Sequence, residues 1–228
     1  MLPREEIATA QIPGGDNLTL VSHGRDFIIM LGRDELMGTR MQYSEEQLAV
    51  LTLELLSTPK PRVLIGGYGM GFTFRAALAG LPATGGQVVV AEVVPEILDW
   101  AKGPLAHLTG ETLSDPRGEV VLADVAALVD DAVDGTTDKY DAVLLDVDNG
   151  PDGIVRDGNE RLYTRTGIGR LRDALNVGGV LAVWSAAPDH KFTRRLMDAG
   201  LEVDVRTVRA RPNNKGPQHT IWFARRVR

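Results

Sequence analysis

Two aspartates close an apolar segment in the sequence Leu144-Leu-Asp-Val-Asp-Asn-Gly-Pro151. Side chains two positions apart along an extended chain point the same way, so Asp146 and Asp148 are expected to face one pocket. Paired carboxylates at the end of a strand suit the binding and deprotonation of a cationic amine. We therefore predict Asp146 and Asp148 as catalytic residues.

A glycine-rich segment, Gly66-Gly-Tyr-Gly-Met-Gly71, follows a short apolar run and precedes a helical pattern. Glycines permit a tight turn and let a ligand approach the main chain, although such a segment can also be a packing turn. Glu92 ends the next apolar run, where an acid can accept hydrogen bonds from both ribose hydroxyls or can be a surface acid. Asp124 ends the third run and is expected to accept from an adenine amino group, to cap the next helix, or to do both.

These side chains need a sheet that brings several strand ends together. From residue 62 onward, short apolar runs alternate with helical patterns, one of them predicted over residues 95–107. Near-continuous apolar strands indicate a sheet that is buried on both faces, and the last two runs follow one another as a hairpin. The pattern predicts an α/β fold with a doubly wound, mostly parallel seven-stranded Rossmann-like sheet.

The first part of the chain predicts a smaller unit in front of this sheet. Residues 17–41 have the pattern of a small β unit, with strands at 17–21 and 26–31. Ser44 is expected to cap a helix that runs to about Leu56, and two prolines close it. We accordingly divide the chain into residues 1–58, the β unit and helix, and residues 59–228, the Rossmann-like domain.

Composition excludes several classes of protein. The chain has 228 residues, 43% hydrophobic and 25% charged, which is typical of a globular protein. It has no cysteine, so disulfides, zinc-thiolate sites and cysteine nucleophiles are excluded. The four histidines are scattered, and the segment after Asp146 fits a calcium loop poorly, so no metal is predicted. No apolar stretch suits a signal peptide or a membrane span, which favours a cytoplasmic protein without a membrane partner.

The net charge of −6 argues against a nucleic-acid partner, because phosphate neutralisation needs surplus Lys and Arg. Basic residues gather near the C-terminus, from Arg206 to Arg228. We interpret them as a solvated edge, with an RNA-binding patch as the alternative.

With these residues in place, the chain resembles the spermidine synthase family, a branch of the class I AdoMet-dependent methyltransferase superfamily. The resemblance covers residues 17–225 and rests on motifs that occur in family order: Tyr43-Ser-Glu45, Val63-Leu-Ile-Gly-Gly67, Thr73-Phe-Arg75, Glu92, Asp124, Leu145-Asp146, Leu162-Tyr-Thr164 and Gly178-Gly179. It implies a methyltransferase-type sheet, S-adenosylmethionine or its decarboxylated form as cofactor, and a homodimer.

The same resemblance distributes roles among the residues. Glu92 with Val93 is expected at the ribose, Asp124 with Val125 at the adenine, and Asp146 on the sulfonium side. The loop residues Gly67, Tyr68, Gly69 and Gly71 are expected to contact the cofactor. Tyr43, Glu45, Asp148 and Tyr163 are expected to shape the pocket of the amine acceptor.

Departures from the family pattern decide which group is transferred. Aminopropyl-transferring members carry an Asp in the glycine loop that holds the amine of the cofactor, and that place falls at or near Met70. Their second catalytic Asp corresponds to Asn149, with Asp148 one step early. A buried ammonium without a partner carboxylate is costly, so we favour intact AdoMet and methyl transfer.

The leading prediction is therefore an AdoMet-dependent methyltransferase that acts on an amine of a small molecule or peptide. The first alternative is a polyamine aminopropyltransferase (spermidine synthase) that uses decarboxylated AdoMet. A non-catalytic nucleoside-binding module is the second, and an RNA methyltransferase is the third.

Overall fold

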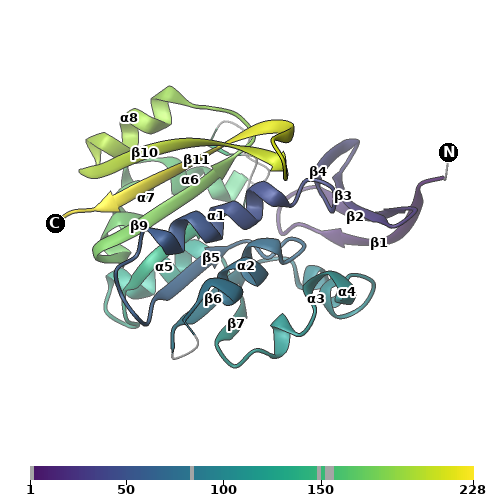
Figure 1. Cartoon of the computed structure of the whole chain (residues 1–228), viewed down its shortest axis with the longest axis horizontal. Coiled ribbons are helices and arrows are strands. Elements are labelled where there is room, and N and C mark those ends of the chain that lie inside the picture. The colour runs from purple at the N-terminus through teal and green to yellow at the C-terminus, as the bar shows by residue number, and fades with distance from the viewer. Residues whose placement is uncertain (1–2, 83–84, 148–149, 152–156) are drawn as a thin grey trace.

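The computed structural model describes residues 3–82, 85–147, 150–151 and 157–228. Its strands form two sheets, which lie side by side in Figure 1. The smaller sheet is antiparallel and comes first in the chain. It has four strands in the order β1-β2-β3-β4: β1 (Glu5–Gln11), β2 (Asn17–His23), β3 (Asp26–Leu31) and β4 (Asp34–Gly38).

The larger sheet has seven strands in the order β10-β11-β9-β8-β5-β6-β7. Their bounds are β5 (Arg62–Gly66), β6 (Gln87–Glu92), β7 (Gly118–Leu122), β8 (Tyr140–Leu145), β9 (Leu175–Ser185), β10 (Leu201–Arg211) and β11 (Lys215–Arg226). β5 to β9 pair in parallel, whereas β11 is antiparallel to both β9 and β10. The predicted mostly parallel seven-stranded sheet, with a closing hairpin and a small N-terminal β unit, is confirmed.

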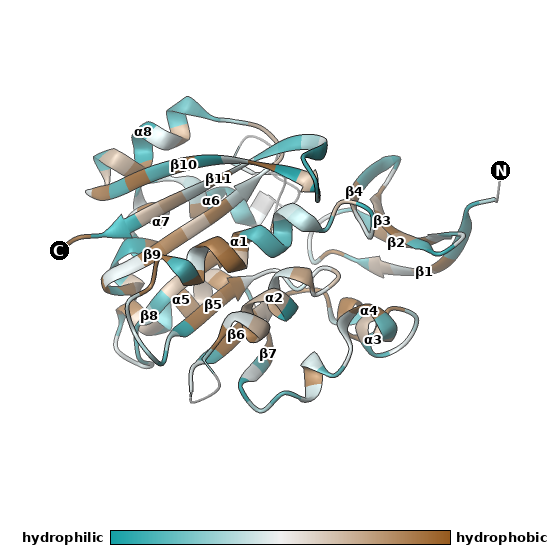
Figure 2. Ribbon diagram, in the orientation of Figure 1, coloured by the Kyte–Doolittle hydropathy of each residue, from teal (hydrophilic) through white to brown (hydrophobic). Residues whose placement is uncertain are grey.

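Apolar side chains cover both faces of the large sheet because successive strand residues point to opposite sides. Val63 and Ile65 of β5 pack into one core, and Leu64 between them packs into the other. In Figure 2 the central strands are accordingly brown, while β10 at the edge is largely teal. The first core is completed by α1 (Tyr43–Glu54), α2 (Phe72–Gly80) and α3 (Pro95–Lys102), the second by α5 (Val125–Val133), α6 (Glu160–Tyr163), α7 (Arg165–Ala174) and α8 (His190–Asp198).

The parallel pairing brings the carboxyl ends of four strands to one edge of the sheet. Gly66 at the end of β5 lies opposite Leu145 of β8 and Ala91 of β6, and Glu92 lies opposite Leu122 of β7. The segments that follow these strands carry the glycine loop, Glu92, Asp124 and Asp146. Four places that are far apart in the sequence thereby meet at one edge.

Two local predictions are wrong. Ser44 does not cap α1, since the N-cap position is Gln42 and no side chain caps the helix. The helix expected over residues 95–107 is broken into α3 and α4 (Ala106–Thr109) around Gly103 and Pro104. Proline lacks the N–H that a continuous helix would need there, and glycine favours the end of a helix.

Two strands of the small sheet, β1 and β4, were not predicted from the hydrophobic pattern of the sequence. β1 is mostly exposed, with Ala10 as its buried residue, so it lacks an apolar face in the sequence. β4 lies within the predicted β unit, at residues for which no strand was predicted. α1, by contrast, packs with α2 against the large sheet, and the division of the chain at residue 58 stays a prediction.

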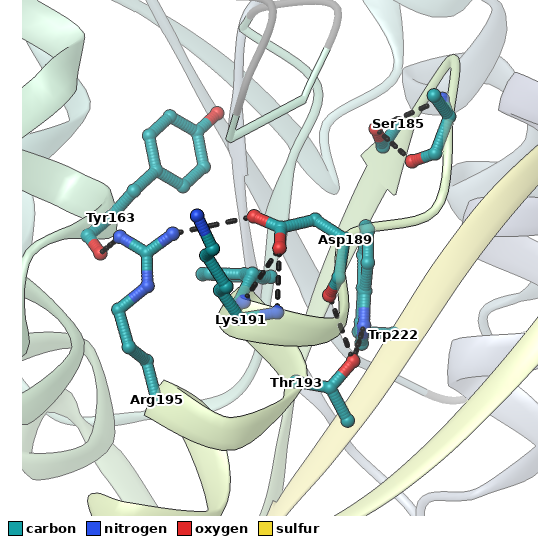
Figure 3. A network of polar contacts seen from close by, with 9 residues as sticks. Tyr163, Ser185, Asp189, Lys191, Thr193, Arg195 and Trp222 are labelled. Atoms are coloured by element: carbon teal, nitrogen blue, oxygen red, sulfur yellow. Dashed lines mark hydrogen bonds and ion pairs between the residues drawn. The ribbon is translucent and has the colours of Figure 1, made fainter.

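Side chains at the start of α8 tie this helix to its neighbours (Figure 3). Asp189 caps the helix by accepting from the amides of Lys191 at 2.7 Å and Phe192 at 2.9 Å. Arg195 reaches from α8 to the carbonyl oxygen of Tyr163 at 2.8 Å and to Asp189 at 3.3 Å. These contacts fix the position of Tyr163 at the end of α6. In the described part of the chain, every helix is too short or too polar to cross a membrane.

Candidate active site

A pocket lies where the carboxyl edge of the large sheet meets the small sheet. The space between its walls, including the part that is open to solvent, is about 970 Å³. Its polar wall consists of the glycine loop and four carboxylates, those of Glu45, Glu92, Asp124 and Asp146. Its apolar wall comes from the small sheet and from α3. The described residues that line it include no Lys or Arg.

The glycine loop forms part of this wall without side chains. Gly67 has φ +88° and Gly69 has φ +53°, conformations that residues with a Cβ rarely adopt. A Cβ at Gly67 would lie 2.5 Å from the carbonyl oxygen of Asp146, and one at Gly69 would lie 2.7 Å from Cε of Met37. The loop therefore presents its main chain to the pocket and packs closely on the end of β8.

Two other loop residues that were predicted to contact a cofactor are placed away from the wall. Tyr68 is 3% exposed, and its ring lies 6.0 Å from that of Phe74 in the core. Its backbone N–H, however, donates to Glu92. Gly71 is the N-cap residue of α2 and is not among the residues that line the pocket.

Glu92 is buried at the end of β6 and organises the backbone around it. Oε2 accepts from the amide of Tyr68 at 2.9 Å, and Oε1 accepts from the amides of Val93 at 2.8 Å and Val94 at 2.9 Å. A carboxylate has about four acceptor sites, so accepting capacity remains toward the pocket that Glu92 lines. Val93 lines the pocket as well.

Asp124 follows β7 and caps α5. Its Oδ1 accepts from the amide of Ala126 at 2.9 Å, and its Oδ2 lies 3.0 Å from Nη2 of Arg161. The capping role expected for Asp124 is thus confirmed. Asp124 and its neighbour Val125 both line the pocket, so capping leaves the side chain on the pocket wall.

Asp146 follows β8 and lines the pocket next to the glycine loop. The hydroxyl of Thr73, at the start of α2, donates to its Oδ2 at 2.7 Å. Burial raises the pKa of Asp146 to about 6, although the hydrogen bond from Thr73 lowers it. A carboxylate with this pKa is largely ionised at pH 7 and is a stronger base than an exposed aspartate.

The residues predicted for an acceptor pocket are not all brought together. Glu45 is 7% exposed and lines the pocket, whereas Tyr43 and Tyr163 are not among the lining residues. The ring of Tyr163 packs edge-on against Phe192, 5.8 Å away. Asp148, with Asn149, lies outside the described residues.

A buried polar cluster next to Glu45 joins three elements. Oγ of Ser44 lies 2.8 Å from Nδ1 of His219 in β11 and accepts from Nε1 of Trp184 in β9 at 3.2 Å. Burial lowers the pKa of His219, which favours the neutral ring. The His219 ring also stands edge-on to Trp184, with centroids 4.7 Å apart. The cluster fixes the first turn of α1, and with it Glu45, against the large sheet.

The apolar wall was missed from the sequence. It includes Ile12, Leu18, Ile29, Leu36 and Met37, from the strands of the small sheet and its β1–β2 connection. Leu18 and Ile29 belong to runs that were read as strands, but nothing in a run shows which cavity its side chains reach. Asn159, Trp184 and Ile97 also line the pocket without a local signal.

Among the described residues, no three His, Asp or Glu side chains gather in a way that could hold a metal ion. This finding does not extend to Asp148.

Curated sequences similar to this chain include polyamine aminopropyltransferases. A polyamine aminopropyltransferase of Saccharolobus islandicus is 32% identical over 136 residues, which are 59% of this chain and 42% of that protein. One from Korarchaeum cryptofilum is 29% identical over 140 residues, 61% of this chain and 40% of that protein. The match thus spans about two fifths of the length of these relatives. No family model matches the chain.

Solved structures share the fold over nearly the whole chain. A spermidine synthase from Thermotoga maritima superposes with a TM-score of 0.75 at 20% identity, covering 97% of this chain and 72% of that one. A spermidine synthase in complex with the transition-state analogue AdoDATO superposes with a TM-score of 0.73 and the same coverage. The human methyltransferase-like protein 13 in complex with SAH gives 0.55 at 18% identity, covering 80% of this chain and 79% of that one.

These comparisons correct the leading functional prediction. Methyl transfer was favoured because Met70 stands where an acid was expected, but the similar sequences are named polyamine aminopropyltransferase. Position 70 does not belong to the pocket wall. Met70 is fully buried in the core and does not line the pocket, whereas Glu45 from α1 places another carboxylate on the same wall as Asp146.

Sheet order, the small N-terminal sheet and sequence similarity agree. The chain has the fold of spermidine synthase structures and is similar in sequence to polyamine aminopropyltransferases.

Proposed function

We propose that this protein is a transferase that moves an aminopropyl group from decarboxylated S-adenosylmethionine to an amine of the polyamine class. The observation that carries the proposal is the position of Asp146. Its carboxylate lies in an acidic pocket, next to a bare glycine loop, with a pKa of about 6. The names of the relatives supply the chemical class.

The pocket fits a nucleoside that carries a positive charge. The main chain of Gly67 and Gly69 leaves room for close approach, and Glu92 keeps free acceptor sites for ribose hydroxyls. Asp124 offers an acceptor for the amino group of an adenine. The apolar wall, which includes Ile29 and Ile97, suits the face of a base. The absence of Lys and Arg from the described lining favours a cation over a phosphate.

When bound, decarboxylated AdoMet supplies a carbon joined to a sulfonium, and an amine nitrogen that attacks this carbon releases a neutral thioether. The protein must hold the amine in line and keep water out. The attacking nitrogen must be neutral, so a carboxylate has to take up its proton. We assign this role to Asp146, because Thr73 fixes its direction and its raised pKa makes it a better base. We keep Asp148 as a proposed second carboxylate.

We place the acceptor amine on the side of the pocket lined by Glu45. Tyr43 and Tyr163 remain proposed parts of the acceptor pocket, as do the homodimer and the cytoplasmic location predicted from the sequence. A small amine suits the acidic lining better than a polyanionic RNA does.

The test is an assay with decarboxylated AdoMet and a panel of diamines and polyamines, followed by mass spectrometry of the amine products. We expect one or more amines to gain an aminopropyl group. The Asp146→Asn variant serves as the control for spontaneous transfer. Tight nucleoside binding without any product from the whole panel would favour the non-catalytic module instead.

A further inference from the structure

The carboxylate of Glu45 has no polar partner among the residues that the structure describes. The side chain is 7% exposed, belongs to the first turn of α1 and lines the pocket. No hydrogen bond or ion pair joins its carboxylate to any residue that the structure describes, although its backbone oxygen accepts from Thr73 at 3.3 Å. Burial of an ionised carboxylate in this way is costly unless a cation or donor meets it.

The other acids of the pocket are partnered to different degrees. Glu92 accepts from three backbone amides, and Asp124 accepts from an amide and pairs with Arg161. Asp146 accepts from the hydroxyl of Thr73. Since the described lining lacks Lys and Arg, the negative charge without compensation is concentrated at Glu45 and Asp146.

These two carboxylates also affect one another. Burial, followed by the charges of Asp146 and Glu46, raises the pKa of Glu45 well above its usual range. The two acids come from different elements, α1 and the end of β8, so the fold brings together like charges that repel. A cation bound between them would relieve this repulsion and would satisfy both groups.

We propose that Glu45 and Asp146 together bind a primary alkylammonium group. Such a group has three N–H donors, and the two carboxylates accept few hydrogen bonds from the described residues. The proposal rests on the proposed function for the source of the ammonium. It is either the end of the aminopropyl arm of the cofactor or one end of the acceptor amine. Glu45 thereby supplies, from α1, a carboxylate that the glycine loop does not supply at Met70.

A structural role for Glu45 is the alternative explanation, since acids in the first turn of a helix interact favourably with the helix dipole. Its neighbour Glu46, in the same turn, is an acid whose partner is a side chain of the protein. Glu46 is partly exposed and pairs with Arg75 at 2.6 Å. Glu45 faces the pocket, so a ligand that carries an ammonium should distinguish the two roles.

The experiment measures the binding of two thioethers of adenosine by calorimetry. One carries an aminopropyl chain and the other a propyl chain, so they differ only in the terminal ammonium. Glu45→Gln keeps the shape of the side chain and removes the charge. Glu54→Gln, at an exposed position of the same helix, is the matched control for net charge. Thermal melts verify that both variants fold.

If the ammonium comes from the cofactor, Glu45→Gln lowers the affinity for the aminopropyl thioether about tenfold or more, since hydrogen bonds to charged groups are strong. It leaves the propyl thioether within about twofold of the wild type, and Glu54→Gln changes neither. If the ammonium comes from the acceptor, Glu45→Gln instead lowers the affinity for putrescine, measured with methylthioadenosine present. The affinity for the aminopropyl thioether then stays unchanged. Both outcomes support the site.

Unchanged binding of both the aminopropyl thioether and putrescine in Glu45→Gln overturns the proposal. Its failure is distinct from that of the proposed function, because binding is measured without turnover. A protein that binds the ammonium ligands through Glu45 but transfers nothing keeps this site and loses the proposed reaction. A protein with normal transfer and no dependence on Glu45 does the reverse.

Discussion

The hydroxyl of Thr73 donates a 2.7 Å hydrogen bond to Oδ2 of Asp146 and so joins the start of α2 to the end of β8. The backbone of Asp146 is held as well, because its amide donates to the carbonyl oxygen of Gly66 at 3.0 Å. The carboxylate that the proposed reaction needs is therefore fixed from two sides. This arrangement leads to the first three predictions.

Replacement of Asp146 by Asn should reduce turnover about 100-fold or more, the range found for the loss of a general base. Asparagine keeps an oxygen that can accept from Thr73, so the fold should be preserved. The rate of thioether release from decarboxylated AdoMet measures the effect. The control is Asp138→Asn, at an exposed position just before β8. Equal rates for the Asp146 variant and this control would remove Asp146 from the mechanism.

The same variant should be more stable than the wild type at pH 8 but not at pH 4. The folded pKa of about 6 lies above the usual 3.8, so the ionised Asp146 opposes folding. This cost is absent below about pH 4, grows as the pH rises to about 6, and is complete above it. At about 1.4 kcal/mol for each pKa unit, the gain at pH 8 should be about 2–3 kcal/mol. Urea unfolding at both pH values measures it, and an equal difference at pH 4 and pH 8 would contradict this account.

Replacement of Gly67 by Ala should disturb both the fold and nucleoside binding. The new Cβ would lie 2.5 Å from the carbonyl oxygen of Asp146 at φ +88°. The close contact and the unfavourable backbone conformation together should lower the free energy of unfolding by more than about 2 kcal/mol. The matched control is Gly135→Ala, with φ +79° and no atom within 4 Å of the added Cβ, which should cost about 1–2 kcal/mol. A similar loss in both variants would mean that backbone conformation alone, and not the contact with Asp146, explains the effect.

Ser44→Ala should destabilise the protein by about 1–3 kcal/mol, because it leaves buried polar groups of Trp184 and His219 without their partner. The expected loss can be measured by urea unfolding near pH 7, where His219 is neutral. The affinity for whichever ligand Glu45 binds, the aminopropyl thioether or putrescine, should fall as well, since the cluster fixes the turn that carries Glu45. Thr52→Ala, which removes a hydroxyl bonded only to its own helix, is the comparison. A cost no greater than that of Thr52→Ala would show that the cluster is dispensable.

Much of the architecture was predictable from local pattern. Helix α5 begins at Val125, directly after Asp124, as expected for a helix that this acid caps, and its apolar face then packs on the sheet. The central strands were found from apolar runs, and their ends located Glu92, Asp124 and Asp146 on one edge. A parallel sheet imposes this convergence once its strands are identified.

The rest depends on contacts that no local pattern contains. Ser44 and His219 are separated by 175 positions, so the serine was read as a helix cap. β1 is mostly exposed and has no apolar face in the sequence, and Met37 reaches the pocket from β4, a strand that was not predicted. The preference for methyl transfer failed for the same reason. It gave weight to the acid missing at Met70, although Met70 is buried in the core and does not line the pocket, whereas Glu45, which was expected in the acceptor pocket, does line it.

The nucleoside released in a direct competition tests the central claim most directly. The enzyme is given equal concentrations of AdoMet and decarboxylated AdoMet with an amine that it accepts, and the nucleosides are separated by chromatography. The account predicts methylthioadenosine, with its release lost in Asp146→Asn. Release of S-adenosylhomocysteine as the main product, with little methylthioadenosine, would contradict it.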